Sequence, residues 1–304
     1  MSCTGTRGKG NPTDPLSLLW IFFILASLQP VVQRQLLATQ RRHSLARISA
    51  ARSATVITLI HRQETFSFLG LPLVRHIDID DAESVLRAIR ETPPGRPIEI
   101  ILHTPGGLVL AASQIAVALA DHDGAVTAVV PHYAMSGGTM IAMAADEIVI
   151  DAHAALSPVD PQLGQYPAAS ILAALDYPGD HKDETLILGD MSRKAMRKVE
   201  GLLGRLLEGR MSAERAKGVS SLLSRGAWTH DHPLLARDLE ALGLPIKIGV
   251  GAEERALLEL YPQPRGRQSP VEYFPGSPGA PPGLPPGRER PRRAGAPQRS
   301  DQKH

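Results

Sequence analysis

The chain has 304 residues, of which 43% are hydrophobic and 21% charged, so it can bury the core of one large domain or two small ones. The net charge of +2 hides an asymmetry, because residues 1–53 carry +6, residues 262–304 carry +5 and the middle of the chain carries −9. The acidic middle argues against a nucleic-acid-binding core, and the lone Cys3 excludes an intrachain disulfide and a cysteine-based metal site.

Residues 1–53 are predicted to form an N-terminal arm that carries a membrane helix over residues 16–32. The apolar run LSLLWIFFILASL begins at Leu16, and its Trp20 suits a membrane interface. The more basic flank follows this run, which predicts a membrane-associated protein whose main domain stays cytoplasmic. The alternative for the same run is a helix that docks on a partner subunit.

The middle segment, residues 54–261, alternates short β-rich runs with helical runs. Continuous apolar runs such as AVTAVV are typical of strands buried on both faces, and strand–helix alternation indicates a mostly parallel sheet. This segment is therefore predicted to be one α/β domain, with strands at residues 56–60, 97–102, 125–130 and 147–150 and helices at residues 80–90, 108–121, 136–145, 184–208, 213–223 and 234–242.

The last segment, residues 262–304, has the composition of a tail. Its 43 residues include 17 prolines and glycines and almost no large apolar side chains. Such a segment cannot bury a core, so it is predicted to be disordered.

Two glycine-marked turns each join a predicted strand to a predicted helix. HTPGG at residues 103–107 follows the strand PIEIIL, and AMSGG at residues 134–138 follows AVTAVV. Parallel α/β proteins bind ligands at the carboxyl ends of their strands, and glycines at a helix start leave backbone N–H groups open to an oxyanion. Ser136 on the second turn has the position of a nucleophile. Taken alone, PGG is also a common turn and SGG a common helix cap, so both interpretations stay open.

Five longer blocks extend this pattern: HTPGGLVLAASQIA, VPHYAMSGGTMIAMAADEIVID, SPVDPQLGQYPAASI, ETLILGDMSRKAMRKV and WTHDHP. They resemble the Clp-protease and signal-peptide-peptidase superfamily, and within it the family called serine dehydrogenase proteinases. The similarity runs from about Pro12 to about Pro264 and is specific, because the blocks occur in the same order. Despite the family name, it implies no dehydrogenase chemistry and no nicotinamide cofactor.

The resemblance implies a fold, an activity and site residues. The fold is a Clp-protease/crotonase-like ββα spiral core, often homo-oligomeric, that hydrolyses polypeptides. Carried over residue by residue, the resemblance makes Ser136 the nucleophile and gives the oxyanion-hole N–H groups to Gly106, Gly107 and Gly137. No metal, other cofactor or nucleic-acid partner is expected.

The general base is less clearly marked. Clp proteases have a histidine about two dozen residues after the nucleophile, but Asp160 stands near that place here. In the signal-peptide-peptidase branch the base is a lysine on a later helix, and the block DMSRKAMRKV makes Lys194 the expected base. Helical spacing alone favours Lys198, which lies nearer to an apolar stripe that would desolvate it. Lys182 and His230 are further alternatives.

Together these features predict a membrane-associated serine peptidase that acts through Ser136 and a lysine base. One alternative is a crotonase-like acyl-CoA enzyme, in which the two turns serve only as an oxyanion hole. That chemistry needs no serine at the helix start, and no acid–base carboxylate is evident beside Gly106 or Ser136. The other alternative is a catalytically inactive scaffold of the same fold.

Overall fold

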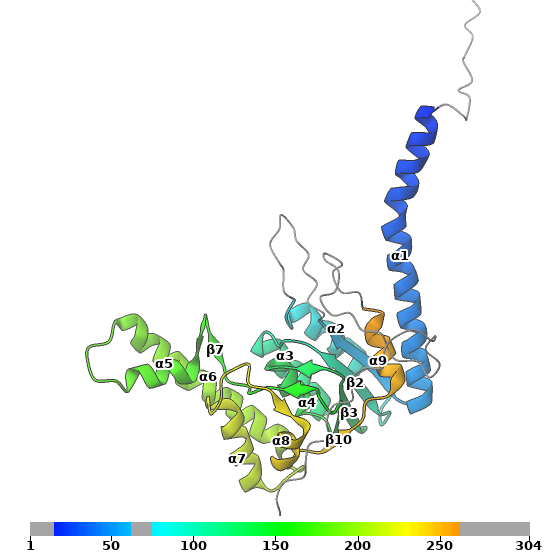
Figure 1. Ribbon diagram of the computed structural model, residues 1–304. Helices are drawn as coiled ribbons and strands as arrows, with labels where there is room; N and C mark the ends of the chain where they lie inside the picture. The colour runs from blue at the N-terminus through cyan, green and yellow to red at the C-terminus, as the bar shows by residue number, and fades with distance from the viewer. Residues whose placement is uncertain (1–14, 62–74, 262–304) are drawn as a thin grey trace, which may run out of the picture. The chain divides into compact units, whose positions relative to one another are not determined.

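The computed structural model describes residues 15–61 and 75–261 (Figure 1). The chain divides into two compact units, residues 1–264 and 265–304, and every element described below belongs to the first unit. The disorder predicted for residues 262–304 lies outside the described residues.

A five-stranded sheet forms the centre of the first unit. Its strand order is β1-β2-β3-β5-β10, and all neighbouring strands are parallel, which confirms the predicted α/β fold. Only β10 is absent from the sequence-based prediction, because a three-residue strand has too little pattern to identify it. The strands are β1 (Thr55–Ile60), β2 (Ile98–His103), β3 (Val126–Val130), β5 (Glu147–Ile150) and β10 (Ile246–Ile248).

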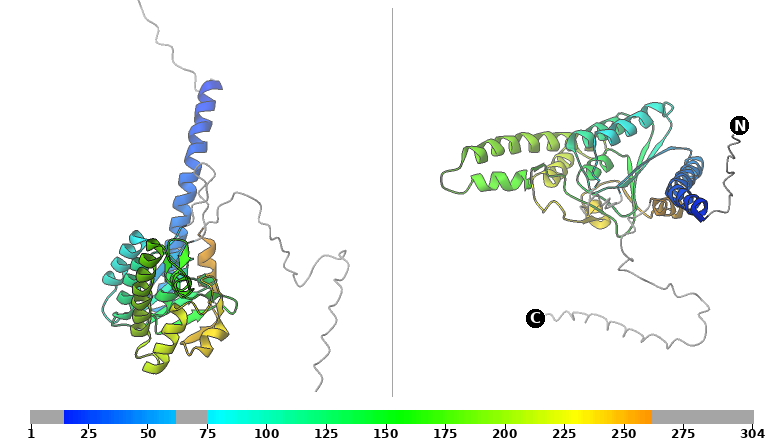
Figure 2. Two further views of the ribbon diagram at one scale, coloured as in Figure 1. Left: turned by 90° about the vertical axis from the view of Figure 1, so that its left-hand side faces the viewer. Right: turned by 90° about the horizontal axis from the view of Figure 1, so that it is seen from above.

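Helices cover both faces of this sheet because successive side chains of a strand point to opposite faces. Ile100 and Leu102 of β2 pack with the larger helical layer, whereas Ile101 packs with α1 and α9. The larger layer contains α2 (Ile79–Glu91), α3 (Val109–Ala120), α4 (Gly137–Ala142), α6 (Asp183–Leu207) and α7 (Ala213–Ser224). The smaller layer contains α1 (Pro15–Arg52) and α9 (Ala252–Glu259), which lie side by side (Figure 2).

Three two-residue strands form a second sheet that positions the loops around the predicted site. In it, β6 (Ala155–Leu156) pairs in parallel with β4 (Tyr133–Ala134) and antiparallel with β9 (Leu234–Leu235). β4 leads into Ser136, β6 leads into Ser157, and β9 follows His230. The remaining elements are the hairpin β7 (Gln162–Leu163) and β8 (Tyr166–Pro167) and the helices α5 (Ala168–Leu175) and α8 (Ala236–Ala241).

The predicted N-terminal arm forms one helix, α1, which continues through Pro30 to Arg52. Its last turns belong to the core, because Ile48 is 1% exposed and packs against β2, β3 and α9. Its first part instead exposes large apolar side chains: Leu19, Trp20, Phe22, Phe23, Leu28, Val31, Val32 and Leu36. Of the helices in the described residues, none is long and apolar enough to cross a membrane, and this includes the helix predicted at residues 16–32.

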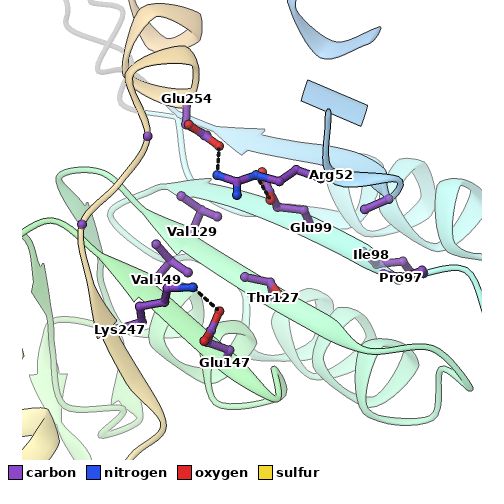
Figure 3. Close-up of a pocket in the computed structure, with 13 residues that line it drawn as sticks. Arg52, Pro97, Ile98, Glu99, Thr127, Val129, Glu147, Val149, Lys247 and Glu254 are labelled. Carbon is purple, nitrogen blue, oxygen red and sulfur yellow. Dashed lines mark hydrogen bonds and ion pairs between the residues drawn. The ribbon is translucent and has the colours of Figure 1, made fainter. Parts of the chain in front are cut away.

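Arg52 fixes the end of α1 between two buried carboxylates (Figure 3). Its guanidinium lies 2.9 Å from Glu254 of α9 and 3.6 Å from Glu99 of β2. Burial raises the pKa of Glu99, and the nearby charge of Glu254 raises it further, while Arg52 opposes both effects. The single positive charge of Arg52 therefore offsets only part of the free-energy cost of burying the carboxylates of Glu99 and Glu254.

Glu99→Gln should raise the melting temperature at pH 8 by about 2–4 °C, the shift that about 1 kcal/mol produces in a domain of this size. A raised pKa means that ionisation of Glu99 costs stability as the pH rises through it, so the gain should vanish near pH 4. Thermal unfolding at both pH values measures this effect. The control is Glu147→Gln, because Glu147 lines the same cavity of about 240 Å³ as Glu99 but its side chain is 45% exposed. An unchanged or lower melting temperature for Glu99→Gln at pH 8 would contradict the argument.

Candidate active site

The two glycine turns lie side by side. Thr104 and Ala134 form a parallel β-bridge, in which the Met135 N–H donates to the Thr104 carbonyl (2.9 Å) and the Thr104 N–H donates to the Tyr133 carbonyl (3.2 Å). The turns that the sequence marked separately are therefore joined by backbone hydrogen bonds at the carboxyl edge of the sheet.

Ser136 lies on the second turn in a strained conformation. It precedes the first residue of α4, with φ +50° and ψ −112°, and only Ser53 shares a positive φ among the described non-glycine residues. Its N–H donates to the hydroxyl of the buried Ser157 (2.7 Å), which helps to hold this conformation. Strain of this kind persists only where the surroundings impose it, and it is typical of catalytic turns.

The first turn requires glycine because the nucleophile turn approaches it closely. A Cβ atom on Gly106 would lie 2.8 Å from Cβ of Ser136 and 2.9 Å from the carbonyl oxygen of Met135. In addition, Gly106 has φ +103°, which other residues rarely adopt. Any side chain at this position would push Ser136 out of place.

Two backbone N–H groups are placed to bind an oxyanion. The N–H of Gly137, the first residue of α4, is among those that a helix leaves without an internal acceptor. Gly107 pairs with Ile77 in a parallel β-bridge, but the two hydrogen bonds of this bridge use the Gly106 carbonyl and the Leu108 N–H. The N–H of Gly107 therefore points to the opposite side. A Cβ on Gly137 would lie 3.6 Å from the Gly107 nitrogen, which places the two groups close together.

Gly106, the third predicted donor, is used differently. Its N–H donates to Oγ1 of Thr104 (3.2 Å) within the same turn. Gly107 and Gly137 are therefore the two predicted N–H groups that remain for an oxyanion, because the third already has an acceptor.

A histidine–carboxylate pair joins residues that are 70 positions apart in the sequence. Nδ1 of His230 lies 2.8 Å from Oδ1 of the buried Asp160, and Gln162 donates to Oδ2 of Asp160 (2.7 Å). A carboxylate only accepts, so Nδ1 of His230 carries the proton and Nε2 becomes the atom that can accept one. The hydrogen bond to Asp160 raises the pKa of His230, while burial partly opposes it.

One cavity of about 470 Å³ brings these groups together. Ser136, Gly107, Gly137, Asp160 and His230 all line it. A second cavity of about 540 Å³ shares Asp160 and His230 and is also lined by the stacked rings of Trp228 and His232. His230 thus lies between these two cavities, and the first of them is also lined by Ser136, Gly107 and Gly137.

The predicted lysines lie elsewhere. Lys194 is on α6 with its side chain 65% exposed, and its Nζ pairs with Asp190 one helical turn earlier. Lys182 and Lys198 are exposed as well, and none of the three lines the cavity of Ser136. In this single chain His230, and none of these lysines, lines the cavity that contains Ser136.

Sequence reasoning noticed parts of this site but missed their connection. The sequence marks Asp160 only as standing where a Clp-type histidine would be, and it offers His230 only as an alternative base. Ser157 and Gln162 had no predicted role, although they occur with Asp160 in the block SPVDPQLG. Among the described residues, no group of three or more His, Cys, Asp or Glu side chains is placed to hold a metal ion.

Most of the chain is similar to known proteins. Residues 10–282 match the family described as ClpP-like SDH-type serine proteinase. Two proteins of Methanocaldococcus jannaschii, the uncharacterized proteins MJ0137 and MJ1495, are each 46% identical to the chain, and the matches cover 88% and 89% of the chain and 96% and 93% of the relatives.

Solved structures with a similar fold include two of ClpP1 from Listeria monocytogenes, one of them a mutant with a single substitution. The mutant matches with a TM-score of 0.42 over 69% of this chain and 97% of that chain, and the other structure matches with 0.41 over 64% and 92%. Sequence identity to both is 14%.

Proposed function

Because the chain belongs to the family of ClpP-like SDH-type serine proteinases, we propose that it is a serine peptidase with Ser136 as nucleophile and His230 as general base. The observation that carries the proposal is that a strained serine, two backbone oxyanion donors and a histidine–aspartate pair line one cavity. Each of these groups has a defined role in acyl transfer.

The proposed reaction proceeds in two stages. Nε2 of His230 takes the proton of the Ser136 hydroxyl as Oγ attacks the peptide carbonyl, and the N–H groups of Gly107 and Gly137 hold the negative oxygen. The protonated His230 then gives its proton to the leaving amine, and water hydrolyses the acyl-serine by the same steps in reverse order. Asp160 stabilises the imidazolium and keeps Nδ1 protonated, and Gln162 orients Asp160.

The lysine base that the family resemblance implied stays a prediction. Lys194 would have to leave Asp190 and the solvent and enter the cavity, or reach the Ser136 of another copy of the chain. His230 already lines that cavity. The homo-oligomer implied by the resemblance also stays a prediction.

Purified protein should react covalently with a fluorophosphonate probe at Ser136, and Ser136→Ala should abolish the reaction while it leaves the fold intact. Intact-mass spectrometry and peptide mapping measure the adduct, and circular dichroism checks the fold. Ser224→Ala is the matched serine control, because Ser224 is buried on α7, donates to the Ser220 carbonyl and does not line the cavity of Ser136, so this variant should still react. A wild-type chain that never reacts would instead favour an acyl-CoA enzyme or an inactive scaffold.

The rate of labelling should rise with pH through a pKa above the ordinary histidine value of about 6.5, because His230 must be neutral to accept the proton and Asp160 raises its pKa. Asp160→Asn removes the carboxylate that raises the pKa of His230. The labelling rate of this variant should therefore rise at lower pH and reach a lower plateau. His230→Ala should lower the rate by about 10²–10⁴-fold.

Lys194→Met is the matched test of the other base and should keep the wild-type rate, since Lys194 makes only an exposed ion pair. Lys198→Met serves as a second control on the same helix. If Lys194→Met lost its rate while His230→Ala kept it, the base would be Lys194 and Ser136 would survive as nucleophile.

We also propose that the first part of α1 attaches the protein to a membrane surface, with the catalytic unit on the cytoplasmic side. Trp20, Phe22 and Phe23 are all more than half exposed there, and the segment 1–53 carries +6. Amphipathic aromatic side chains and basic residues both favour an anionic lipid interface.

The full chain should float with anionic liposomes in a density gradient, and a variant with Trp20, Phe22 and Phe23 changed to Gln should stay at the bottom. Leu186→Gln together with Ile187→Gln changes equally exposed apolar side chains on α6 and should leave flotation unchanged. A wild-type chain that stays at the bottom, or that forms a larger oligomer through this segment, would contradict membrane attachment.

A further inference from the structure

A second series of carboxylate, imidazole and hydroxyl groups is hydrogen-bonded to the PGG turn at residues 105–107. Nε2 of His61, at the end of β1, lies 3.1 Å from Oδ2 of Asp81 on α2, and Nδ1 of His61 lies 2.9 Å from Oγ1 of Thr104. His61 is buried and Thr104 is fully buried, and neither lines the cavity of Ser136. These groups therefore cannot meet a substrate, although their chemistry is that of a catalytic triad.

The direction of each hydrogen bond follows from the chemistry of the groups. The Asp81 carboxylate only accepts, so Nε2 of His61 donates to it and Nδ1 of His61 must accept. The hydroxyl of Thr104 then donates to Nδ1. Its oxygen accepts the N–H of Gly106 (3.2 Å), so the chain ends on the backbone of the PGG turn.

The same helix start holds the turn from its other side. Asp81 and Asp78 cap α2 reciprocally, and Oδ2 of Asp81 accepts the Asp78 N–H (3.0 Å) as well as the His61 proton. The residue before this cap, Ile77, donates to the Gly106 carbonyl (2.8 Å) and accepts the Leu108 N–H (2.8 Å). These contacts form a closed ring that passes through Gly106 and Ile77. Ile77 also accepts from Leu108, so both neighbours of Gly107 are held in place.

We infer that Asp81 and His61 are positioning residues, which act through the Thr104 hydroxyl to hold the PGG turn so that the Gly107 N–H faces the oxyanion. This inference rests on the proposed function of Ser136. Electrostatic stabilisation needs donors that are already in place, because a donor that must reorganise during the reaction contributes much less. The ring supplies that order without placing a side chain in the cavity.

Burial keeps His61 in the neutral form that these hydrogen bonds require. Burial lowers its pKa, with a contribution from Arg75, while Asp81 and Asp78 oppose the change. The pKa of His230 shifts in the opposite direction. His61 therefore stays neutral over the pH range in which His230 loses its proton. Breaking the hydrogen bonds that join Asp81, His61 and Thr104 should then change the plateau of the labelling rate and leave unchanged the pH at which the rate rises.

A pair of substitutions at Thr104 separates the hydroxyl from the shape of the side chain. Thr104→Val keeps both branches of the side chain, including the methyl group that lies close to Gly138. It removes the hydroxyl that donates to His61 and accepts from the Gly106 N–H. Thr104→Ser keeps the hydroxyl. Thr92→Val is the control, because Thr92 is also buried and its hydroxyl donates to the Ala88 carbonyl at the end of α2, away from the turn.

Two readouts test the inference: the fluorophosphonate labelling rate against pH, and hydrogen exchange of the backbone over residues 104–108. Thr104→Val and His61→Phe should each lower the plateau rate by about 10–100-fold, which is less than the loss of about 10²–10³-fold seen when one oxyanion donor is removed outright, and each should speed exchange in this segment. Thr104→Ser should stay within about threefold of the wild type in both, and Thr92→Val should change neither.

The inference is overturned if Thr104→Val keeps wild-type exchange and labelling, or if Thr104→Ser loses as much as Thr104→Val. A wild-type chain that never labels at Ser136 would count against the proposed function alone, because the exchange of residues 104–108 still reports whether the hydroxyl holds the turn.

Discussion

The site depends on the close approach of two backbone turns. Thr104 bridges to Ala134, and Gly106 lies so near Ser136 that a single Cβ atom would collide with the nucleophile. Parallel strands end at the same edge of a sheet, so the fold brings the turns to one place, and glycine lets them meet. The strain at Ser136 and the outward N–H groups of Gly107 and Gly137 both follow from this contact.

A second, much smaller sheet supplies the remaining chemistry. Its three two-residue strands hold the segments that precede Ser136 and Ser157 and the segment that follows His230. This arrangement lets Asp160 meet His230 across 70 residues of sequence. Burial of Asp160 makes the pair effective, because a carboxylate shielded from water binds an imidazolium more strongly than an exposed one does. The contacts of Arg52 with Glu99 and Glu254 lie on the other face of the sheet and leave this cavity untouched.

The sequence predicted the parts of the molecule that have local patterns. Apolar β-rich runs identified four of the five strands of the main sheet. The paired PGG and SGG turns indicated a nucleophile at Ser136, and that role stays a prediction. The strands β4, β6 and β9 escaped prediction because two residues show no periodicity. The pairing of His230 with Asp160 escaped for a related reason, since no spacing rule connects side chains that meet only through tertiary structure. Lys194 was expected from its sequence block alone, which carries no information about solvent exposure.

The most direct test of the central claim is a crystal structure of the chain after reaction with a fluorophosphonate. The account predicts phosphorus bound to Oγ of Ser136, with the phosphoryl oxygen about 2.7–3.1 Å from the nitrogens of Gly107 and Gly137. Nε2 of His230 should lie within hydrogen-bond distance of the bound oxygen. An adduct on another residue, or a phosphoryl oxygen turned away from both glycines, would contradict it.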